Sequence, residues 1–110
     1  MFNIFKKKPM NYQDIDAVTF EEMMQKNDHV VLDVRSPQEY GEGKIEPHRL
    51  INFFESDFKS KVEQLDKDKT YLVYCRSGNR SGQACGLMGQ MGFNNLYNLK
   101  GGIGAWNAKG

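Results

Sequence analysis

Tyr71 to Ser81 reads Tyr-Leu-Val-Tyr-Cys-Arg-Ser-Gly-Asn-Arg-Ser, and this stretch decides how the chain is expected to fold. Its first four residues are an uninterrupted apolar run of the kind found in buried strands. Cys75 then opens a short polar loop, and a helical pattern of apolar residues follows Ser81. A strand, a tight loop and a helix in this order form the repeating unit of parallel α/β sheets.

The strands expected elsewhere in the chain fit the same architecture. The β-branched run Val30–Val34 predicts a strand buried on both faces of a parallel sheet. Shorter strands are expected at residues 12–18 and 96–99. Strands that alternate with helices predict a three-layer α/β domain with a mostly parallel sheet, and active sites in such sheets lie beyond the carboxyl ends of the strands.

Helix starts and turns are expected at residues with capping or turn chemistry. Thr19 with Glu22 predicts a capping box at the start of a first helix, and Ser56 predicts the start of another. Gly92 is placed to end the helix that follows the cysteine loop. We expect residues 38–55 to be irregular and residues 101–106 to form a glycine-rich turn.

Composition narrows the classes of function. The chain has 110 residues, 26% of them charged and 39% hydrophobic, with a net charge of +1. These values predict one compact domain at residues 12–110 and argue against nucleic-acid binding. The two cysteines form no disulfide framework, which favours a reducing, cytoplasmic setting. His29 and His48 lack metal-ligand spacing, so no metal is expected.

The first eleven residues differ from the rest in character. Met1–Phe5 is apolar except for Asn3 and is followed by three lysines and a proline. The apolar part is too short for a signal-peptide core or a membrane span. We expect residues 1–11 to be a flexible leader with no stable membrane association.

Cys75 is the residue best suited to chemistry. It lies where a strand ends and a helix approaches, so free backbone amides and the helix dipole favour an anion there. Arg76 and Arg80 add two positive charges. These effects predict a lowered pKa for Cys75, whose thiolate is the nucleophilic form. The alternative, a buried structural cysteine, is the interpretation we favour for Cys85.

Three motifs resemble the rhodanese-like sulfurtransferases in their small single-domain form. In chain order they are Val31-Leu32-Asp33-Val34-Arg35 with Glu39-Tyr40 and Gly43, then Cys75-Arg76-Ser77-Gly78-Asn79-Arg80-Ser81, then Leu99-Lys100-Gly101-Gly102 with Trp106. The resemblance spans Ile15 to Lys109. It implies a rhodanese-like domain with helices on both faces of the sheet and a persulfide carried on Cys75.

The resemblance also implies an activity like that of thiosulfate sulfurtransferases. Sulfane sulfur would pass from thiosulfate or a persulfide donor, through Cys75, to a thiol or cyanide acceptor, without a cofactor. A thioredoxin-like or sulfur-relay protein is a further candidate partner. The residues expected to bind substrate are Arg76, Ser77, Gly78, Asn79 and Arg80, where the arginines suit an oxyanion and Gly78 permits a tight loop.

Two features of the first half of the chain bear on the surroundings of the site. Asp33 and Arg35 are interpreted as a structural hydrogen-bonding pair. Lys44 to Asn52 reads Lys-Ile-Glu-Pro-His-Arg-Leu-Ile-Asn, where the family usually has glycine-histidine-isoleucine-proline-glycine-alanine and then asparagine. This segment borders the mouth of the site in the family, so substrate access and partner choice are left open.

Two other functions compete with sulfur transfer. A thiolate phosphatase or arsenate reductase also uses a cysteine in an anion-binding loop, but such phosphatases place an arginine six positions after the cysteine. Here Arg80 stands at the fifth position and Ser81 at the sixth, so the loop is one residue short. A non-catalytic rhodanese-like binding or regulatory module is the other alternative, and such modules typically lack the cysteine.

Overall fold

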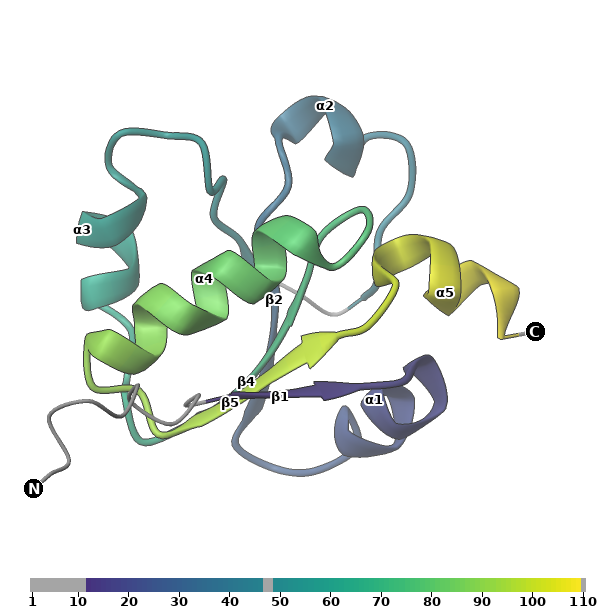
Figure 1. Cartoon of the computed structure of the whole chain (residues 1–110), viewed down its shortest axis with the longest axis horizontal. Helices are drawn as coiled ribbons and strands as arrows, with labels where there is room; N and C mark the ends of the chain where they lie inside the picture. Colours follow the sequence, from purple (N-terminus) through teal and green to yellow (C-terminus); the bar gives the residue numbers. More distant parts are fainter. Residues whose placement is uncertain (1–11, 47–48, 110) are drawn as a thin grey trace, which may run out of the picture.

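The computed structural model describes residues 12–46 and 49–109, so the leader predicted at residues 1–11 lies outside the described residues. Strands and helices alternate along the described chain (Figure 1). The strands are β1 (Tyr12–Ile15), β2 (His29–Asp33), β3 (Arg49–Leu50), β4 (Thr70–Tyr74) and β5 (Asn95–Leu99). The helices are α1 (Ala17–Met23), α2 (Pro37–Tyr40), α3 (Phe58–Glu63), α4 (Asn79–Gln90) and α5 (Gly102–Ala108).

The strands form one sheet with the order β1-β5-β4-β2-β3, and every pairing in it is parallel. Strand β4 lies at the centre, where Leu72 is in register with Val31 of β2 on one side and Tyr97 of β5 on the other. The predicted parallel α/β sheet is confirmed. Because all strands point the same way, their carboxyl ends gather at one edge, and the loop that begins at Cys75 lies there (Figure 1).

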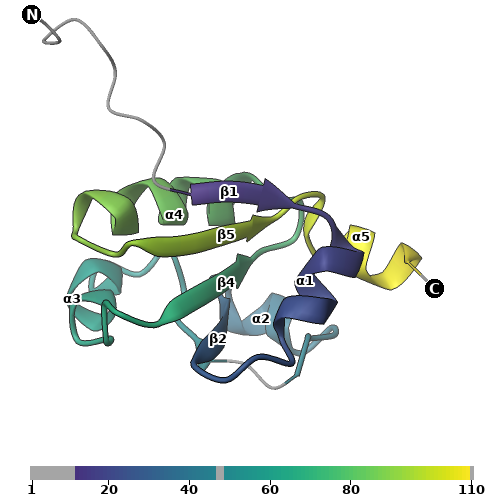
Figure 2. The same ribbon diagram turned by 90° about the horizontal axis from the view of Figure 1, so that it is seen from below.

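Helices cover both faces of the sheet, which gives the three predicted layers (Figures 1 and 2). The alternation of side chains along β4 divides the core into two clusters. Tyr71, Val73 and Cys75 pack under α3 and α4 on one face. Leu72 and Tyr74 pack with residues of α1 and α5 on the opposite face. A strand buried on both faces in this way explains its uninterrupted apolar sequence.

The first helix begins earlier than predicted. Asp16, not Thr19, is its N-cap, because the Asp16 carboxylate accepts a hydrogen bond of 2.8 Å from the Thr19 amide. The expected capping box of Thr19 and Glu22 is therefore wrong, and β1 ends at Ile15 instead of reaching residue 18. An aspartate is at least as good a cap as a threonine, and the shorter strand leaves Ala17 free to start the helix.

Two further helices were not predicted. Ser36 and Glu39 form a complete capping box that starts α2, and this helix runs into the segment expected to be irregular. Residues 101–106 were expected to form a turn, but α5 begins at Gly102. Ser56 is not the cap of α3, which follows Asp57. The predicted end of α4 is confirmed, since Gly92 has a left-handed φ of 104° just beyond the helix.

None of the helices in the described ranges is long and apolar enough to cross a membrane.

Candidate active site

Cys75 lies at the point where β4 enters the loop to α4, and its side chain is fully buried. The Sγ atom accepts hydrogen bonds from the Gly78 amide at 3.1 Å and the Ser81 amide at 3.4 Å. The Ser81 hydroxyl lies 3.3 Å from the same sulfur. The loop therefore curls around the sulfur so that its backbone donors converge on a position where negative charge is favoured.

These donors outweigh the effect of burial on the thiol. Burial alone raises the pKa of Cys75, but hydrogen bonds from the Ser81 hydroxyl and from the amides of Ser81, Gly78 and Ser77 lower the pKa below its ordinary value. The direction agrees with the sequence-based prediction. The backbone amides that were expected to favour an anion are among the groups that lower the pKa, whereas the two arginines are not.

Glycines allow the loop to pack against the segment that follows β5. Gly78 has a φ of 99°, and a Cβ atom there would lie 3.2 Å from the Leu99 carbonyl oxygen. Gly102 has a φ of 62°, and its Cβ would lie 2.2 Å from the Arg76 carbonyl oxygen. The Ile103 amide also donates a 3.0 Å hydrogen bond to the Cys75 carbonyl oxygen. The start of α5 thus holds the first two residues of the loop in place.

The other loop residues predicted to bind substrate lie at the surface. Arg76, Ser77 and Asn79 are exposed. The Ser77 hydroxyl accepts a 3.4 Å hydrogen bond from the Asn79 amide, and Asn79 Oδ1 accepts one of 2.7 Å from Gln83. Among the residues that the structure describes, none forms an ion pair or hydrogen bond with the Arg76 guanidinium. Its charge remains available to an anion.

Arg80 has a partner that the sequence did not indicate. Its Nη1 and Nη2 atoms each lie 2.7 Å from one oxygen of Glu39 at the start of α2, and the guanidinium carbon lies 5.3 Å from the ring centre of Phe54. Hydrogen bonds from Arg80 are the main reason that the pKa of Glu39 falls to about 2. Contact between Arg80 and a substrate stays a prediction, since the ion pair already occupies both terminal nitrogens.

A pocket of about 200 Å³ opens beside the loop. It is polar and carries both signs of charge, and its lining residues are Arg35, Glu39, Glu42, Gly43, Arg76, Ile103 and Asn107. Arg35 and Glu39 are already held in ion pairs with other residues. The Arg76 guanidinium is therefore the lining cation that is not committed to a described residue.

Asp33 and Arg35 form the predicted pair beneath this pocket. Both are buried, and Arg35 Nη2 lies 2.8 Å from Asp33 Oδ2. The Tyr74 hydroxyl donates a 2.8 Å hydrogen bond to Asp33, while Arg35 donates one of 2.6 Å to the Gly43 carbonyl oxygen. The pair therefore ties the end of β2 to β4 and to the chain after α2, in agreement with the structural role predicted for it.

A chain of hydrogen bonds behind the cysteine runs from the buried residues Ser81 and Asn98 to Asp14, which is exposed. The Ser81 hydroxyl donates to Asn98 Oδ1 at 2.5 Å, and Asn98 Nδ2 donates to Asp14 at 2.9 Å and to the Gly78 carbonyl oxygen at 3.1 Å. In the sequence Ser81 stood out only as the last residue of the cysteine motif, and Asn98 and Asp14 carried no sequence signal. Their contacts depend on the pairing of β1 with β5, which brings Asp14 opposite Asn98.

The segment that departs from the family pattern is partly described. Residues 47–48 lie outside the described residues. On either side of them Ile45 and Ile51 are buried, and the Ile45 amide donates to the Tyr74 hydroxyl at 3.1 Å. The Lys44 ammonium lies 4.8 Å from the ring centre of Tyr40. The segment is thus anchored to the core by its two isoleucines.

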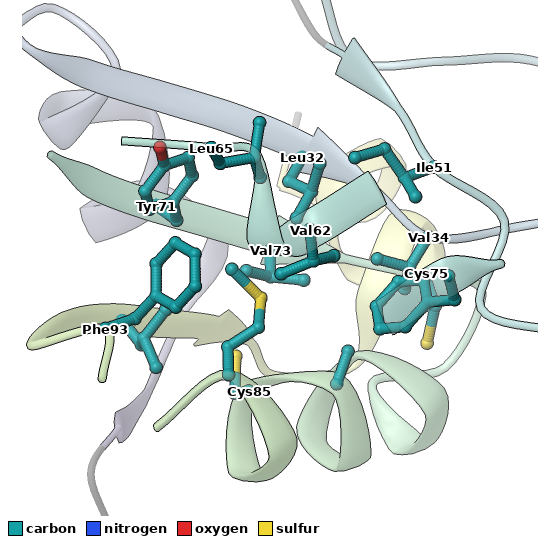
Figure 3. Close-up of a cluster of buried hydrophobic side chains, with 14 residues drawn as sticks. Leu32, Val34, Ile51, Val62, Leu65, Tyr71, Val73, Cys75, Cys85 and Phe93 are labelled. Atoms are coloured by element: carbon teal, nitrogen blue, oxygen red, sulfur yellow. The ribbon is translucent and has the colours of Figure 1, made fainter. Parts of the chain in front are cut away.

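Cys85 points from α4 into the apolar cluster that also holds Val73 and Phe93 (Figure 3). It is fully buried, and burial raises its pKa far above the ordinary value. This environment agrees with the interpretation of Cys85 as a core residue.

Comparisons with known proteins agree on one family. The rhodanese-like domain matches residues 16–109. A sulfurtransferase of Allochromatium vinosum is 34% identical over 103 residues, which cover 88% of this chain and 90% of the relative. The thiosulfate sulfurtransferase GlpE of Coxiella burnetii is 31% identical over 99 residues, which cover 90% of this chain and 91% of that protein.

A solved structure shows the same fold. The crystal structure of a rhodanese-related protein from Thermoplasma volcanium superposes with a TM-score of 0.79 at 35% identity. The match covers 90% of this chain and 94% of the other.

Proposed function

Because this chain belongs to the rhodanese-like domain family, we propose that it is a sulfurtransferase that carries sulfane sulfur on Cys75. The observation that carries the proposal is the convergence of three hydrogen-bond donors, from Gly78 and Ser81, on a buried sulfur whose pKa is lowered. A thiolate stabilised in this way is both a nucleophile and a good leaving group, and sulfur transfer needs both properties.

Loading begins with attack of the Cys75 thiolate on the outer sulfur of a donor. With thiosulfate, the Sγ–S bond forms, the S–S bond of the donor breaks, and sulfite leaves with the bonding electron pair. The product is a cysteine persulfide whose negative charge lies on the outer sulfur. Backbone amides of the loop stabilise such an anion without a metal.

Unloading reverses these roles. A thiolate or cyanide acceptor attacks the outer sulfur, a new bond to that sulfur forms, and the Sγ–S bond breaks. Cys75 leaves as a thiolate and keeps the electron pair, so no external oxidant or reductant is consumed. The donors around Sγ favour this step because they stabilise the charge that returns to it.

Arg76 is the residue we assign to capture of an anionic donor. Its guanidinium lines the pocket beside the loop and has no partner among the described residues. Guanidinium binds oxyanions through paired charge-assisted hydrogen bonds, which suits the sulfonate end of thiosulfate. The amides of Ser77, Gly78 and Asn79 and the Arg80 side chain complete the substrate-binding loop in this proposal.

The physiological donor in this proposal is a carrier of sulfane sulfur, and the acceptor is a thiophile. The thiosulfate sulfurtransferase among the relatives supports thiosulfate as a donor. A persulfide on a small molecule or on a sulfur-relay protein would react at the same sulfur. A thioredoxin-like dithiol is a suitable protein acceptor, since its thiolate attacks the outer sulfur as a small thiol does.

Intact-protein mass spectrometry after incubation with thiosulfate tests the proposal. We expect a gain of one sulfur atom that cyanide removes, in the wild type and in the matched control Cys85→Ala, but not in Cys75→Ser. If thiosulfate gives no gain but a glutathione persulfide does, the mechanism stands with a different donor. A folded protein with a free Cys75 thiol that accepts sulfur from neither donor would refute it.

A further inference from the structure

The Ser81 hydroxyl faces two acceptors with one hydrogen. Its oxygen lies 3.3 Å from Cys75 Sγ and 2.5 Å from Asn98 Oδ1, and Ser81 is fully buried. A hydroxyl can donate only one hydrogen bond at a time. The two contacts therefore compete for the same proton, and the charge on the sulfur decides which of them is made.

Asn98 cannot exchange its oxygen for its nitrogen at this position. The side-chain amide donates to the Asp14 carboxylate at 2.9 Å and to the Gly78 carbonyl oxygen at 3.1 Å, and both of these groups are acceptors only. These two bonds use both hydrogens of the amide and leave Oδ1 facing Ser81. Asn98 itself is only 5% exposed, so water does not readily take over the role of this oxygen.

We propose that Asn98 is a positioning residue for sulfur transfer, whose carbonyl oxygen accepts the Ser81 hydroxyl whenever the Cys75 sulfur is uncharged. This inference rests on the proposed function for its role in turnover. When the sulfur is a thiolate, the hydroxyl donates to the sulfur. When the sulfur bears a proton or the transferred sulfur atom, the hydroxyl turns to Asn98.

This change of acceptor by the Ser81 hydroxyl matters because Sγ is negatively charged before loading and uncharged in the persulfide. In the persulfide the negative charge lies on the outer sulfur, and Sγ becomes a poor acceptor. Without Asn98 the buried hydroxyl would then have no good acceptor, and an unpaired buried polar group is unfavourable. As the Sγ–S bond breaks during unloading, the electron pair returns to Sγ, and the Ser81 hydroxyl donates its hydrogen bond to the sulfur again. Asn98 thus stabilises the loaded state relative to the free thiolate.

Several titratable groups surround this chain of hydrogen bonds. Cys75 follows β4, Cys85 lies on α4, and Tyr12 and Asp14 lie on β1. Besides burial, the charges on Asp14 and Cys75 raise the pKa of Cys85. Besides the hydrogen bonds to Glu39, the charge on Cys75 raises the pKa of Arg80. Asp14 is the group among these that contacts Asn98 directly.

The test is the pH dependence of Cys75 alkylation by iodoacetamide, with the label assigned to Cys75 by peptide mass spectrometry. Ser81→Ala should raise the pKa of Cys75 by about one unit, because the thiolate loses a charge-assisted hydrogen bond. Asn98→Ala should lower it by about half a unit, because the hydroxyl no longer has a competing acceptor. The exposed residue Asn95 on the same strand supplies the matched control, Asn95→Ala, which should change nothing.

The double variant separates positioning from simple support of the loop. If Asn98 acts through the hydroxyl, Asn98→Ala has no effect on the pKa of Cys75 once Ser81 is alanine. A raised pKa in Asn98→Ala, or an equal shift with and without Ser81, would overturn the proposal. Should Asn98→Ala fail to fold, Asn98→Ser replaces it with the same expected direction, since its shorter hydroxyl does not reach the position of Oδ1.

A second readout concerns the loaded state. At equal concentrations of donor and acceptor, Asn98→Ala should hold several-fold less persulfide at equilibrium than the wild type, and occupancy equal to that of the wild type would count against the proposal. If the wild type takes up no sulfur at all, the proposed function fails. The alkylation titration still decides whether Asn98 and Cys75 share the Ser81 proton.

Discussion

Replacing Gly102 with alanine should damage both the stability of the fold and the geometry of the loop. Gly102 has a φ of 62°, and a Cβ atom there would lie 2.2 Å from the Arg76 carbonyl oxygen and 2.6 Å from that of Cys75. Cβ atoms in proteins essentially never approach other atoms closer than 3.0 Å. Since the opposing atoms are backbone, no side-chain rotation relieves the contact.

The magnitude follows from two contributions. A left-handed conformation costs alanine about 1–2 kcal/mol relative to glycine. The displacement of packed backbone costs a further 1–3 kcal/mol, as overpacked cores do. We therefore expect Gly102→Ala to lower the free energy of unfolding by about 2–5 kcal/mol, a large part of the roughly 5–15 kcal/mol typical of a domain.

Urea unfolding followed by Trp106 fluorescence measures this loss, and the rate of Cys75 alkylation reports on the loop. The matched control is Gly104→Ala, two residues further along α5, where an added Cβ meets no atom within 4 Å. That variant should be neutral or stabilised by about 0.5–1 kcal/mol through helix propensity. A Gly102→Ala protein within about 0.5 kcal/mol of the wild type, with an unchanged alkylation rate, would refute the reasoning.

Three other predictions follow from the site. The pKa of Glu39 falls to about 2 in the folded protein, so its ion pair with Arg80 contributes fully to stability above the ordinary value of 4.5 and is lost as the pH falls through 2. Urea unfolding should therefore show Glu39→Gln less stable than the wild type by about 1–2 kcal/mol at pH 6, and this difference should close toward pH 2.5. A difference that persists at pH 2.5 would contradict the assignment. Native alkylation should label Cys75 but not Cys85 until urea unfolds the chain, because the pKa of Cys75 is lowered whereas that of Cys85 is raised by burial in the core; equal labelling of both in the native protein would contradict this difference in pKa. Arg76→Ala should slow loading by thiosulfate about tenfold or more, and Arg76→Lys should recover part of the rate. The rate is measured by quenching the reaction at successive times and determining the fraction of persulfide by mass spectrometry. An unchanged rate would show that Arg76 does not capture the donor.

The parts of the fold that sequence predicted are those fixed by local pattern. The apolar runs at Val30–Val34 and Tyr71–Tyr74 needed no knowledge of the rest of the chain to be identified as buried strands, since burial on both faces leaves no polar alternation. Once two such strands are followed by helices, a parallel sheet is the natural arrangement, and Cys75 must lie at its carboxyl edge.

The parts that sequence missed depend on contacts between distant segments. Two of the seven residues of α5 are glycines, which disfavour a helix on their own. The helix forms because the Ile103 amide donates a hydrogen bond to the Cys75 carbonyl oxygen. In addition, the Trp106 ring packs edge-on against Phe20, with ring centres 6.0 Å apart. Local propensity gives way here to tertiary packing.

The same limit applies to the site. Cys75 and its loop are contiguous in sequence, so their chemistry could be predicted from the sequence alone. Glu39 meets Arg80 across 41 residues, and Asp14 meets Asn98 across 84. An acidic residue in a first helical turn and an asparagine in a strand have many other uses, and only the strand order makes them partners of the loop.

The edge position of β1 has a consequence for synthesis. Its strand partner in the described sheet is β5, and the paired residues are 84 positions apart. At about 5–20 residues per second, a ribosome needs roughly 4–17 s to make the intervening chain. For the last 23 of these residues, roughly 1–5 s at the same rate, the nascent chain contains Cys75 but not Asn98, so the Ser81 hydroxyl lacks its alternative acceptor. The hydrogen bonds behind Cys75 are complete only when β1 and β5, the first and last strands in chain order, have paired.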